Sequence, residues 1–428
     1  MNDFINIINI GAILVFVLTY YNVYKKSSYI FGLLFLPFTF WMQLLISSAY
    51  IETGTYLIDF KQYSYATGST IRLFLLLEIQ MIIFLIESKR IEKKIVKIEQ
   101  HKSSYRYLYN ICFICIIFAL YLLIDIILFP PENRFTYYSR TRHFPLINIV
   151  SYFSYTMTFI MGYIVSKYKN NKIKFLTLLY LILTIFCLYL KGVQFGGFSI
   201  SIIMFFCPTI IELAKKKKII KIRYIVATVF IILVLLIPKY NFYTKTTMYN
   251  SIGINNAYEK LIYRAFSQGA DLTWVIDKQI VNENKIDYKQ FWIELSGFIN
   301  GEENNTGAYY LMNRSCPSSV LEVYLSGTAS ITGGYPIIWA AIFGYWGSII
   351  PIIVDGLLFT YLMYKIALAI KKERFFVLVM LIFIYNQCYS IIMSSGISYL
   401  GNLIPKLFLT ILLILDLIHK PIVFKKKN

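Results

Sequence analysis

The sequence predicts an all-α polytopic membrane protein with about 11 transmembrane helices and one large external loop. Apolar runs of roughly 20 residues, the length that crosses a bilayer as a helix, recur along the 428-residue chain. Only 15% of the residues are charged, against about 25% in a typical soluble protein. Runs such as residues 225–238 do not alternate with polar residues, so spanning helices are expected rather than a barrel.

Eleven apolar runs define the predicted spans. They cover residues 7–24, 29–51, 70–87, 107–129, 146–166, 175–190, 198–214, 224–238, 336–370, 375–393 and 403–419. The ninth run is too long for one plain span, and Gly344 and Gly347 within it predict a broken or re-entrant start. The chain therefore divides into a bundle of eight spans (1–238), a large loop (239–335) and a second bundle of three spans (336–428).

Basic residues set the expected orientation. Alternate connections between the runs hold 26 of the 42 Lys and Arg residues, whereas the loop 239–335 is nearly balanced, with eight basic and nine acidic residues. Basic connections stay in the cytoplasm. The C-terminus is therefore expected inside, and the N-terminus and the long loop are expected outside. In a bacterium this arrangement corresponds to the cytoplasmic (inner) membrane, with the loop in the periplasm.

Several function classes are excluded or disfavoured. The net charge of +20 comes from short clusters between apolar runs, which is typical of membrane topology and not of nucleic-acid binding. Five of the six cysteines lie in or beside apolar runs, so no disulfide framework is expected. The three histidines are far apart in the sequence, so a histidine-based metal site is disfavoured. The sequence contains neither the phosphate-binding (Walker A) motif nor the Gly-x-Ser-x-Gly motif of α/β-hydrolases. We expect no metal and no cofactor, and the first apolar run is expected to be retained as a helix.

The long loop holds the first candidate site. Arg264 and Gln268 are four residues apart and would share one face of a helix. The guanidinium group suits phosphate, and the amide can donate to phosphate or to sugar hydroxyls. Arg314 is a second candidate in the same loop. The alternative is a helix whose charged face is simply solvated.

Two other external connections carry candidate residues. Lys191 begins a glycine-rich turn that includes Gln194, at the surface where a lipid diphosphate would lie; the alternative is a helix hairpin with a snorkelling lysine. Arg140, Arg142 and His143 form either a second phosphate-facing patch or a basic outlier in an external loop. Within or near the spans, Glu78, Asp125 and Asp355 are costly unless paired and are therefore further candidates.

Three local motifs accompany the predicted arrangement of eleven spans and one long external loop. An external arginine is followed by Gln-Gly and a tryptophan, at Arg264, Gln268–Gly269 and Trp274. In the second motif, a Gly-Gly-x-Pro segment at 333–336 leads into Phe-Gly-x-x-Gly at 343–347. The third motif is a turn of the type Lys-Gly-x-Arg, which begins here at Lys191 and has Gln194 in place of the arginine. In plan and in these motifs the chain resembles the O-antigen polymerase (Wzy-type) family of oligosaccharide repeat-unit polymerases.

The resemblance implies a GT-C-like fold and an inverting, metal-independent glycosyltransferase. Donor and acceptor would be oligosaccharides linked to undecaprenyl diphosphate, and a chain-length regulator and a flippase would be partners. Arg264 and Lys191 would stabilise the leaving diphosphate, assisted by Arg314 or Arg140. Asp271 would be the base, with Glu294 and His143 as rivals. The remaining substrate-binding residues would be Gln194, Gln268, Arg142 and His143.

Other functions stay open at the sequence level. A lipid-linked oligosaccharide flippase or polysaccharide transporter is favoured by Glu78 and Asp355 and disfavoured by the 97-residue loop. A membrane acyltransferase acting on surface glycan is disfavoured because that class relies on a histidine base. A structural membrane scaffold is a further alternative.

Overall fold

A computed structural model describes residues 2–99, 103–130, 144–191, 195–216, 256–266, 269–301, 305–325, 333–394 and 396–418. This part of the chain is about 83% helical, and it contains nine helices long and apolar enough to cross a membrane. The prediction of an all-α, multi-pass membrane protein is therefore confirmed at that level. The predicted eighth span, residues 224–238, lies outside the described residues.

The nine long helices coincide with nine of the predicted spans. They are α1 (Asn2–Lys26), α2 (Ser28–Ile51), α3 (Ser69–Val96), α4 (Tyr105–Leu128), α5 (Ile147–Lys167), α6 (Asn171–Leu190), α7 (Phe195–Lys215), α15 (Ile349–Lys372) and α16 (Phe375–Ser394). Helix α3 continues beyond its apolar part and includes the basic stretch after Glu87. The last predicted span corresponds to α17 (Leu403–Ile418), which is shorter.

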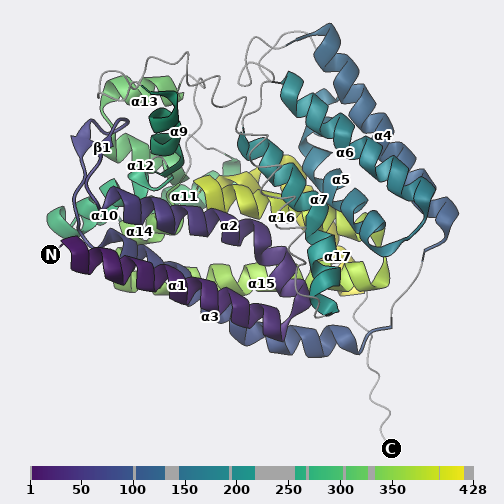
Figure 1. Cartoon of the computed structure of the whole chain (residues 1–428), viewed down its shortest axis with the longest axis horizontal. Coiled ribbons are helices and arrows are strands. Elements are labelled where there is room, and N and C mark those ends of the chain that lie inside the picture. Colours follow the sequence, from purple (N-terminus) through teal and green to yellow (C-terminus); the bar gives the residue numbers. More distant parts are fainter. Residues whose placement is uncertain are drawn as a thin grey trace, which may run out of the picture.

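The long helices form two groups that share a core. Helices α1, α2, α3 and α15 pack side by side, and α4–α7 form the second group (Figure 1). Helix α2 contacts α7, and α16 contacts both α15 and α5, so α2 and α16 join the groups. Many exposed side chains of these helices are large and apolar, for example Leu14, Phe113 and Leu358, as expected for surfaces that face lipid.

The described parts of the predicted loop fold into five short helices. These are α9 (Ala257–Phe266), α10 (Asp271–Glu283), α11 (Gln290–Asn300), α12 (Gly307–Ser315) and α13 (Ser318–Leu325). They gather at the end of the molecule where α1 begins, together with a two-stranded hairpin of β1 (Tyr56–Leu57) and β2 (Gln62–Tyr63) (Figure 1). We call these five helices the loop helices and this end of the molecule the loop end.

The ninth predicted span begins with a break. Helix α14 (Ile337–Gly347) is interrupted at Gly344, whose φ of 71° and ψ of 171° are not helical, and α15 follows directly. A positive φ is accessible to glycine because it has no Cβ atom. The irregular backbone expected there is present. The corner between α16 and α17 is a short 3-10 helix, η2 (Ile397–Gly401).

One buried carboxylate joins the first three helices at the loop end. Glu52, at the end of α2, accepts hydrogen bonds from the backbone N–H groups of Gly68 (2.5 Å) and Ser69 (2.8 Å) at the start of α3. Its other oxygen accepts from Asn9 of α1 (3.0 Å). Burial raises the pKa of Glu52, but hydrogen bonds, with that from Thr70 the largest, outweigh burial and hold this pKa below its ordinary value. Gly68 is the N-cap residue of α3 and has no side chain, so the Glu52 carboxylate accepts the hydrogen bonds of the first N–H groups in its place.

Close packing between α5 and α7 depends on Gly162. A Cβ atom at this position would overlap the carbonyl oxygen of Phe205 and lie 2.7 Å from its carbonyl carbon. Small residues allow such close approach of helices in membranes. We expect Gly162→Ala to lower the free energy of unfolding by about 1–3 kcal/mol, because the obstructing atoms are backbone and only a shift of a helix relieves the clash.

Thermal unfolding of the purified protein in detergent tests this expectation. Gly11→Ala is the matched control, because no atom lies within 4 Å of the added Cβ atom on α1. That variant should be neutral or slightly stabilising, since alanine favours the helix over glycine. An unchanged unfolding midpoint for Gly162→Ala would contradict the close helix packing.

Candidate functional site

The most deeply buried ion pair at the loop end joins α3 to α10. Arg72 donates two hydrogen bonds to Asp277, from Nε to Oδ1 (2.7 Å) and from Nη2 to Oδ2 (2.6 Å). The hydroxyl of Tyr345, from α14, also donates to Asp277. The Asp277 side chain is fully buried and that of Arg72 is 26% exposed. A two-pronged pair of this kind fixes orientation as well as charge, so it places α10 on the outer end of α3.

Asp271 begins α10 and lies in a second cluster of charges. Its Oδ1 accepts from the backbone N–H of Leu272 (2.8 Å), and the side chain is buried. Burial raises the pKa of Asp271 well above its usual range, nearby Asp59 of the hairpin raises it further, and Arg264 opposes both. Two of the residues singled out from the sequence, Arg264 and Asp271, are therefore close enough to interact electrostatically.

Helix α9 carries Arg264 into this cluster. Tyr263, the neighbouring residue, donates a hydrogen bond to the backbone carbonyl of Tyr56 in β1, which fastens α9 to the hairpin. Arg264 lies in the last turn of α9 and is half-buried. The helix ends at Phe266, and Gln268 lies outside the described residues.

Arg314 lines an open groove of about 350 Å³ on the loop helices. Its Nε donates to Gln279 of α10 (2.9 Å), and its Nη2 donates to the carbonyl of Lys285 (2.5 Å). Asp287 and Tyr310 also line the groove, and the tyrosine donates to the aspartate (3.2 Å). Lys285 also lines the groove, and its ammonium group is paired with Glu283 (2.5 Å). Among the described residues, Arg314 is thus the groove's cationic side chain without a carboxylate partner in an ion pair, and its guanidinium group suits a polar, anionic group.

Glu294, the rival base, occupies a different position. This side chain of α11 is 1% exposed and its Oε1 accepts from Gln290 (3.0 Å) and from the backbone N–H of Gly307 (2.7 Å), the first residue of α12. Burial raises the pKa of Glu294 to about 7, although both hydrogen bonds oppose that shift. Its Oε2 is buried and has no hydrogen-bond partner among the described residues.

On the loop helices, Asp271 and Glu294 both have raised pKa values, and α12 separates them. Glu294 contacts the start of this helix, whereas Asp271 lies near Cys316, directly after its last residue. A helix of nine residues is about 13 Å long. Arg264 accompanies Asp271, so the Arg264–Asp271 cluster is the better candidate for combined acid–base and electrostatic chemistry.

Lys191 lies elsewhere and is buried. It follows the last residue of α6, and its ammonium group donates to the hydroxyl of Ser151 in α5 (2.8 Å). The side chain is 5% exposed, so neither the predicted lysine facing a lipid diphosphate at the surface nor the alternative, a snorkelling lysine, is observed. Gln194, Arg140, Arg142 and His143 lie outside the described residues, so their predicted roles stay predictions.

The acids in or beside the spans each have a partner. Glu78 accepts from the Thr19 hydroxyl (2.5 Å), and Asp355 accepts from the indole N–H of Trp339 (2.8 Å). Asp125 accepts from the backbone N–H of Phe144 (2.8 Å). Hydrogen bonds of this kind offset the expense of polar groups at membrane depth.

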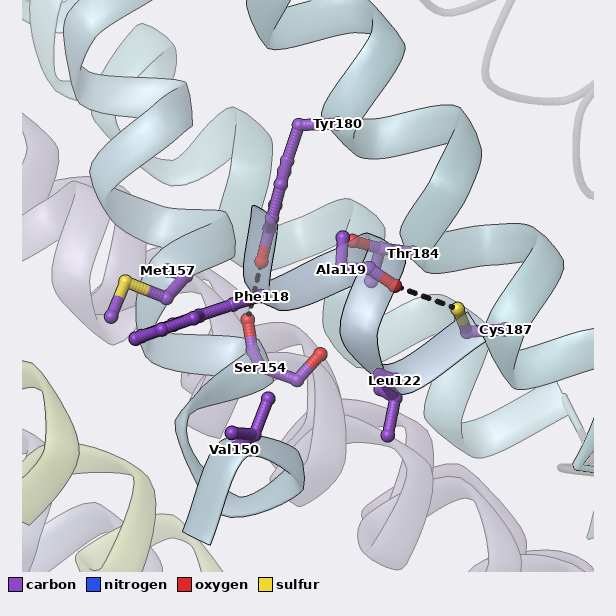
Figure 2. A pocket seen from close by; sticks show the side chains of 9 residues that line it. All are labelled: Phe118, Ala119, Leu122, Val150, Ser154, Met157, Tyr180, Thr184 and Cys187. Carbon is purple, nitrogen blue, oxygen red and sulfur yellow. Dashed lines mark hydrogen bonds between the residues drawn. The ribbon is translucent and has the colours of Figure 1, made fainter. Parts of the chain in front are cut away.

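A small cavity lies between α4, α5 and α6 (Figure 2). None of the charged residues described above lines it. Its volume is about 10 Å³, which is near the minimum for one water molecule. Tyr180 donates across it to the carbonyl of Ser154 (3.1 Å), and Cys187 donates to the carbonyl of Ala119 (3.7 Å). The space is a packing defect and is too small for a substrate. Elsewhere in the described part of the chain, no group of three or more His, Cys, Asp or Glu residues is placed to hold a metal ion.

Comparison with known proteins gives one similarity. Residues 301–410 match a family of unknown function (DUF6418), a segment that extends from the end of α11 to the first turns of α17. The match covers α12, the broken α14 and the α16–α17 corner, and it names no activity. No curated protein and no solved structure matches the chain.

Sequence reasoning missed Arg72 and Asp277. A signal for Arg72 was present, because an arginine in the first turn of an apolar span is expensive and predicts a partner. Nothing in the sequence indicates that this partner lies 205 residues later. Asp277 reads as one of several acids in a mixed-charge loop.

Proposed function

We propose that this protein polymerises oligosaccharide repeat units carried on undecaprenyl diphosphate, by glycosyl transfer on the external face of a bacterial cytoplasmic membrane. About 11 spans, a GT-C-like plan and a periplasmic location of the loop helices belong to the same proposal. The observation that carries it is the electrostatic interaction of Arg264 with Asp271, a buried acid with a raised pKa, at the loop end. The resemblance to Wzy-type polymerases supplies the reaction class.

The proposed step needs a base and a stabilised leaving group. The Asp271 carboxylate takes the proton of the acceptor hydroxyl as the oxygen attacks the anomeric carbon of the donor. The bond from that carbon to the diphosphate oxygen breaks, and the lipid diphosphate departs with the electron pair. Arg264 lies beside the acid and stabilises the developing negative charge. A carboxylate whose pKa is raised is a stronger base than an ordinary one.

The groove at Arg314 provides a second anionic subsite in this proposal. Lys285 and Arg314 line it on the loop helices that also carry Asp271, so it can hold a phosphate or an acidic sugar of one substrate. Arg140 is proposed to assist with the diphosphate, and Gln194, Gln268, Arg142 and His143 to bind substrate. Lys191 is not part of this proposal, because its ammonium group is buried against Ser151. A chain-length regulator and a flippase are the proposed partners.

The proposal is tested by the surface glycan of a strain that lacks the gene. We expect single repeat units on the lipid core in the deletion strain and a ladder of longer glycans on a gel after the gene is restored. Loss of even the single unit would indicate the alternative function, a lipid-linked oligosaccharide flippase, which the acids Glu78 and Asp355 favour.

Single substitutions then test the site. Arg264→Ala and Asp271→Asn should each abolish the ladder while the protein remains inserted in the membrane. Arg90→Ala is the control, because Arg90 is an exposed residue near the far end of α3. Glu294→Gln should keep the ladder if Asp271 is the base. A normal ladder from Arg264→Ala and Asp271→Asn together would sink the site assignment.

A further inference from the structure

Helix α11 exposes large apolar side chains and buries polar ones, the reverse of a helix at a water-exposed surface. Three of its five exposed side chains are large and apolar, namely Trp292 (67%), Ile293 and Ile299 (59%); the other two are Ser296 and Asn300. Its buried side chains include Gln290 (2%) and Glu294 (1%), both polar. The two sets lie on opposite faces, since positions 290, 294 and 297 recur at helical spacing. The apolar face therefore points away from the protein.

The neighbouring loop helix α10 is buried along most of its length. Its buried residues include apolar and charged side chains, such as Trp274 and Asp277, and two of its three exposed residues, Asn282 and Glu283, are polar. Both helices belong to the same predicted loop and are separated by six residues. The reversal is therefore a property of α11 and not of the loop helices in general.

Helix α11 is fastened to the outer ends of the long helices. A Cβ atom at Gly401 of η2 would overlap the carbonyl oxygen of Phe298, so the two backbones touch. Lys406 of α17 donates to the carbonyl of Ile299. At the other end, the ring of Phe291 packs against Phe343 of α14, with 5.5 Å between centroids. The helix thus bridges α14 and the α16–α17 corner.

Exposed apolar side chains of the neighbouring elements continue this face. Trp346 at the end of α14 is 87% exposed, and Ile350 in the first turn of α15 is also exposed. Leu403 at the start of α17 is 82% exposed. Both α15 and α17 are apolar helices of the bundle, so the outer face of α11 continues a surface that faces lipid.

We propose that α11 lies in the membrane interface, with Trp292, Ile293 and Ile299 inserted among the lipids of the leaflet at the loop end. A tryptophan at the boundary and apolar residues on one face are typical of interfacial helices. Lys289 is exposed just before the helix, where an ammonium group meets anionic headgroups. Membrane insertion explains why the polar residues are turned inward, and it is independent of the proposed function.

Spin labels on the full-length protein in lipid nanodiscs test the placement of α11. Nitroxides are attached singly through Trp292→Cys, Ile299→Cys and, as the matched control on α10, Asn282→Cys. The background has Cys316 and Cys388 replaced by alanine, because the other four cysteines are buried. At positions 292 and 299 we expect collisions with oxygen, which partitions into lipid, to exceed collisions with a water-soluble nickel chelate several-fold. The order should reverse at position 282.

Two outcomes would overturn the proposal. Frequent collisions with the nickel chelate at positions 292 and 299 would place the face in water. Low accessibility to both reagents, with dipolar coupling between labels, would show a second copy of the chain on this face. A second measurement, the midpoint of thermal unfolding in nanodiscs, does not depend on labelling. Trp292→Gln and Ile299→Gln should each lower this midpoint by several degrees. The control Val281→Gln, at an exposed apolar position on α10, should leave it unchanged.

Discussion

Asp277→Ala is expected to lower the free energy of unfolding by about 3–5 kcal/mol, the usual effect of removing one partner from a buried pair. The substitution leaves the Arg72 guanidinium at the loop end of α3 without its two-pronged partner, and it leaves the Tyr345 hydroxyl without its acceptor. Thermal and denaturant unfolding of the purified protein measure the loss. Since α10 carries Asp271, polymer synthesis should also fall in this variant.

A double substitution separates the pair from simple loss of packing. Arg72→Met with Asp277→Leu removes both charges and fills the space, so most of the stability should return. The surface pair of Arg90 and Glu87 is the control, and Arg90→Ala should change the free energy of unfolding by about 1 kcal/mol or less. Equal effects of Asp277→Ala and Arg90→Ala would show that the Arg72–Asp277 pair contributes no more than a surface contact.

The buried Glu294 should make the protein less stable as the pH rises from about 4.5 to about 7. Its pKa is raised in the folded state, so the folded protein keeps a proton that the unfolded chain has already released. Stability falls with pH wherever the folded state binds more protons. The shift corresponds to roughly 3 kcal/mol across this window, at 1.36 kcal/mol for each pKa unit.

Glu294→Gln isolates this contribution. The amide is neutral at every pH and keeps an oxygen that accepts from the Gly307 N–H. The variant should therefore gain stability relative to the wild type as the pH rises from 4.5 to 7, seen as a widening difference in the unfolding midpoint. Glu322→Gln, on the exposed face of α13, should show no such trend. Parallel pH profiles of Glu294→Gln and the wild type would contradict the raised pKa.

The long helices were predictable because bilayer thickness imposes one length and one composition on them. Residues 29–51 and 375–393 were predicted as spans, and α2 and α16 follow those ranges within a few residues. The loop helices were not predicted, since each is 8–13 residues long and mixes apolar and charged residues. Such helices are marginal alone and depend on tertiary packing. The break at Gly344 was predicted because two glycines interrupt an over-long apolar run.

The candidate site was predicted only in part. Arg264 and Asp271 are seven residues apart, and the sequence placed both in one external segment; the structure brings them together. Lys191 was expected at the surface beside a lipid headgroup, but it is buried against Ser151, because spacing along the chain does not show which helix packs against its side. The pairing of Arg72 with Asp277 depends on contacts across 205 residues and has no local signature.

The cap formed by Glu52 has a consequence for the order in which the chain assembles during synthesis. Glu52 binds only groups between Asn9 and Thr70, so α1, α2 and the start of α3 can lock together while the rest is still being made. The ion pair of Arg72, which lies at the start of α3, cannot form until Asp277 has been synthesised. A product truncated before α10 would therefore carry well-formed helices with an unpaired guanidinium at their outer end. Such a chain would expose a charge at the loop end that the complete protein keeps paired with Asp277.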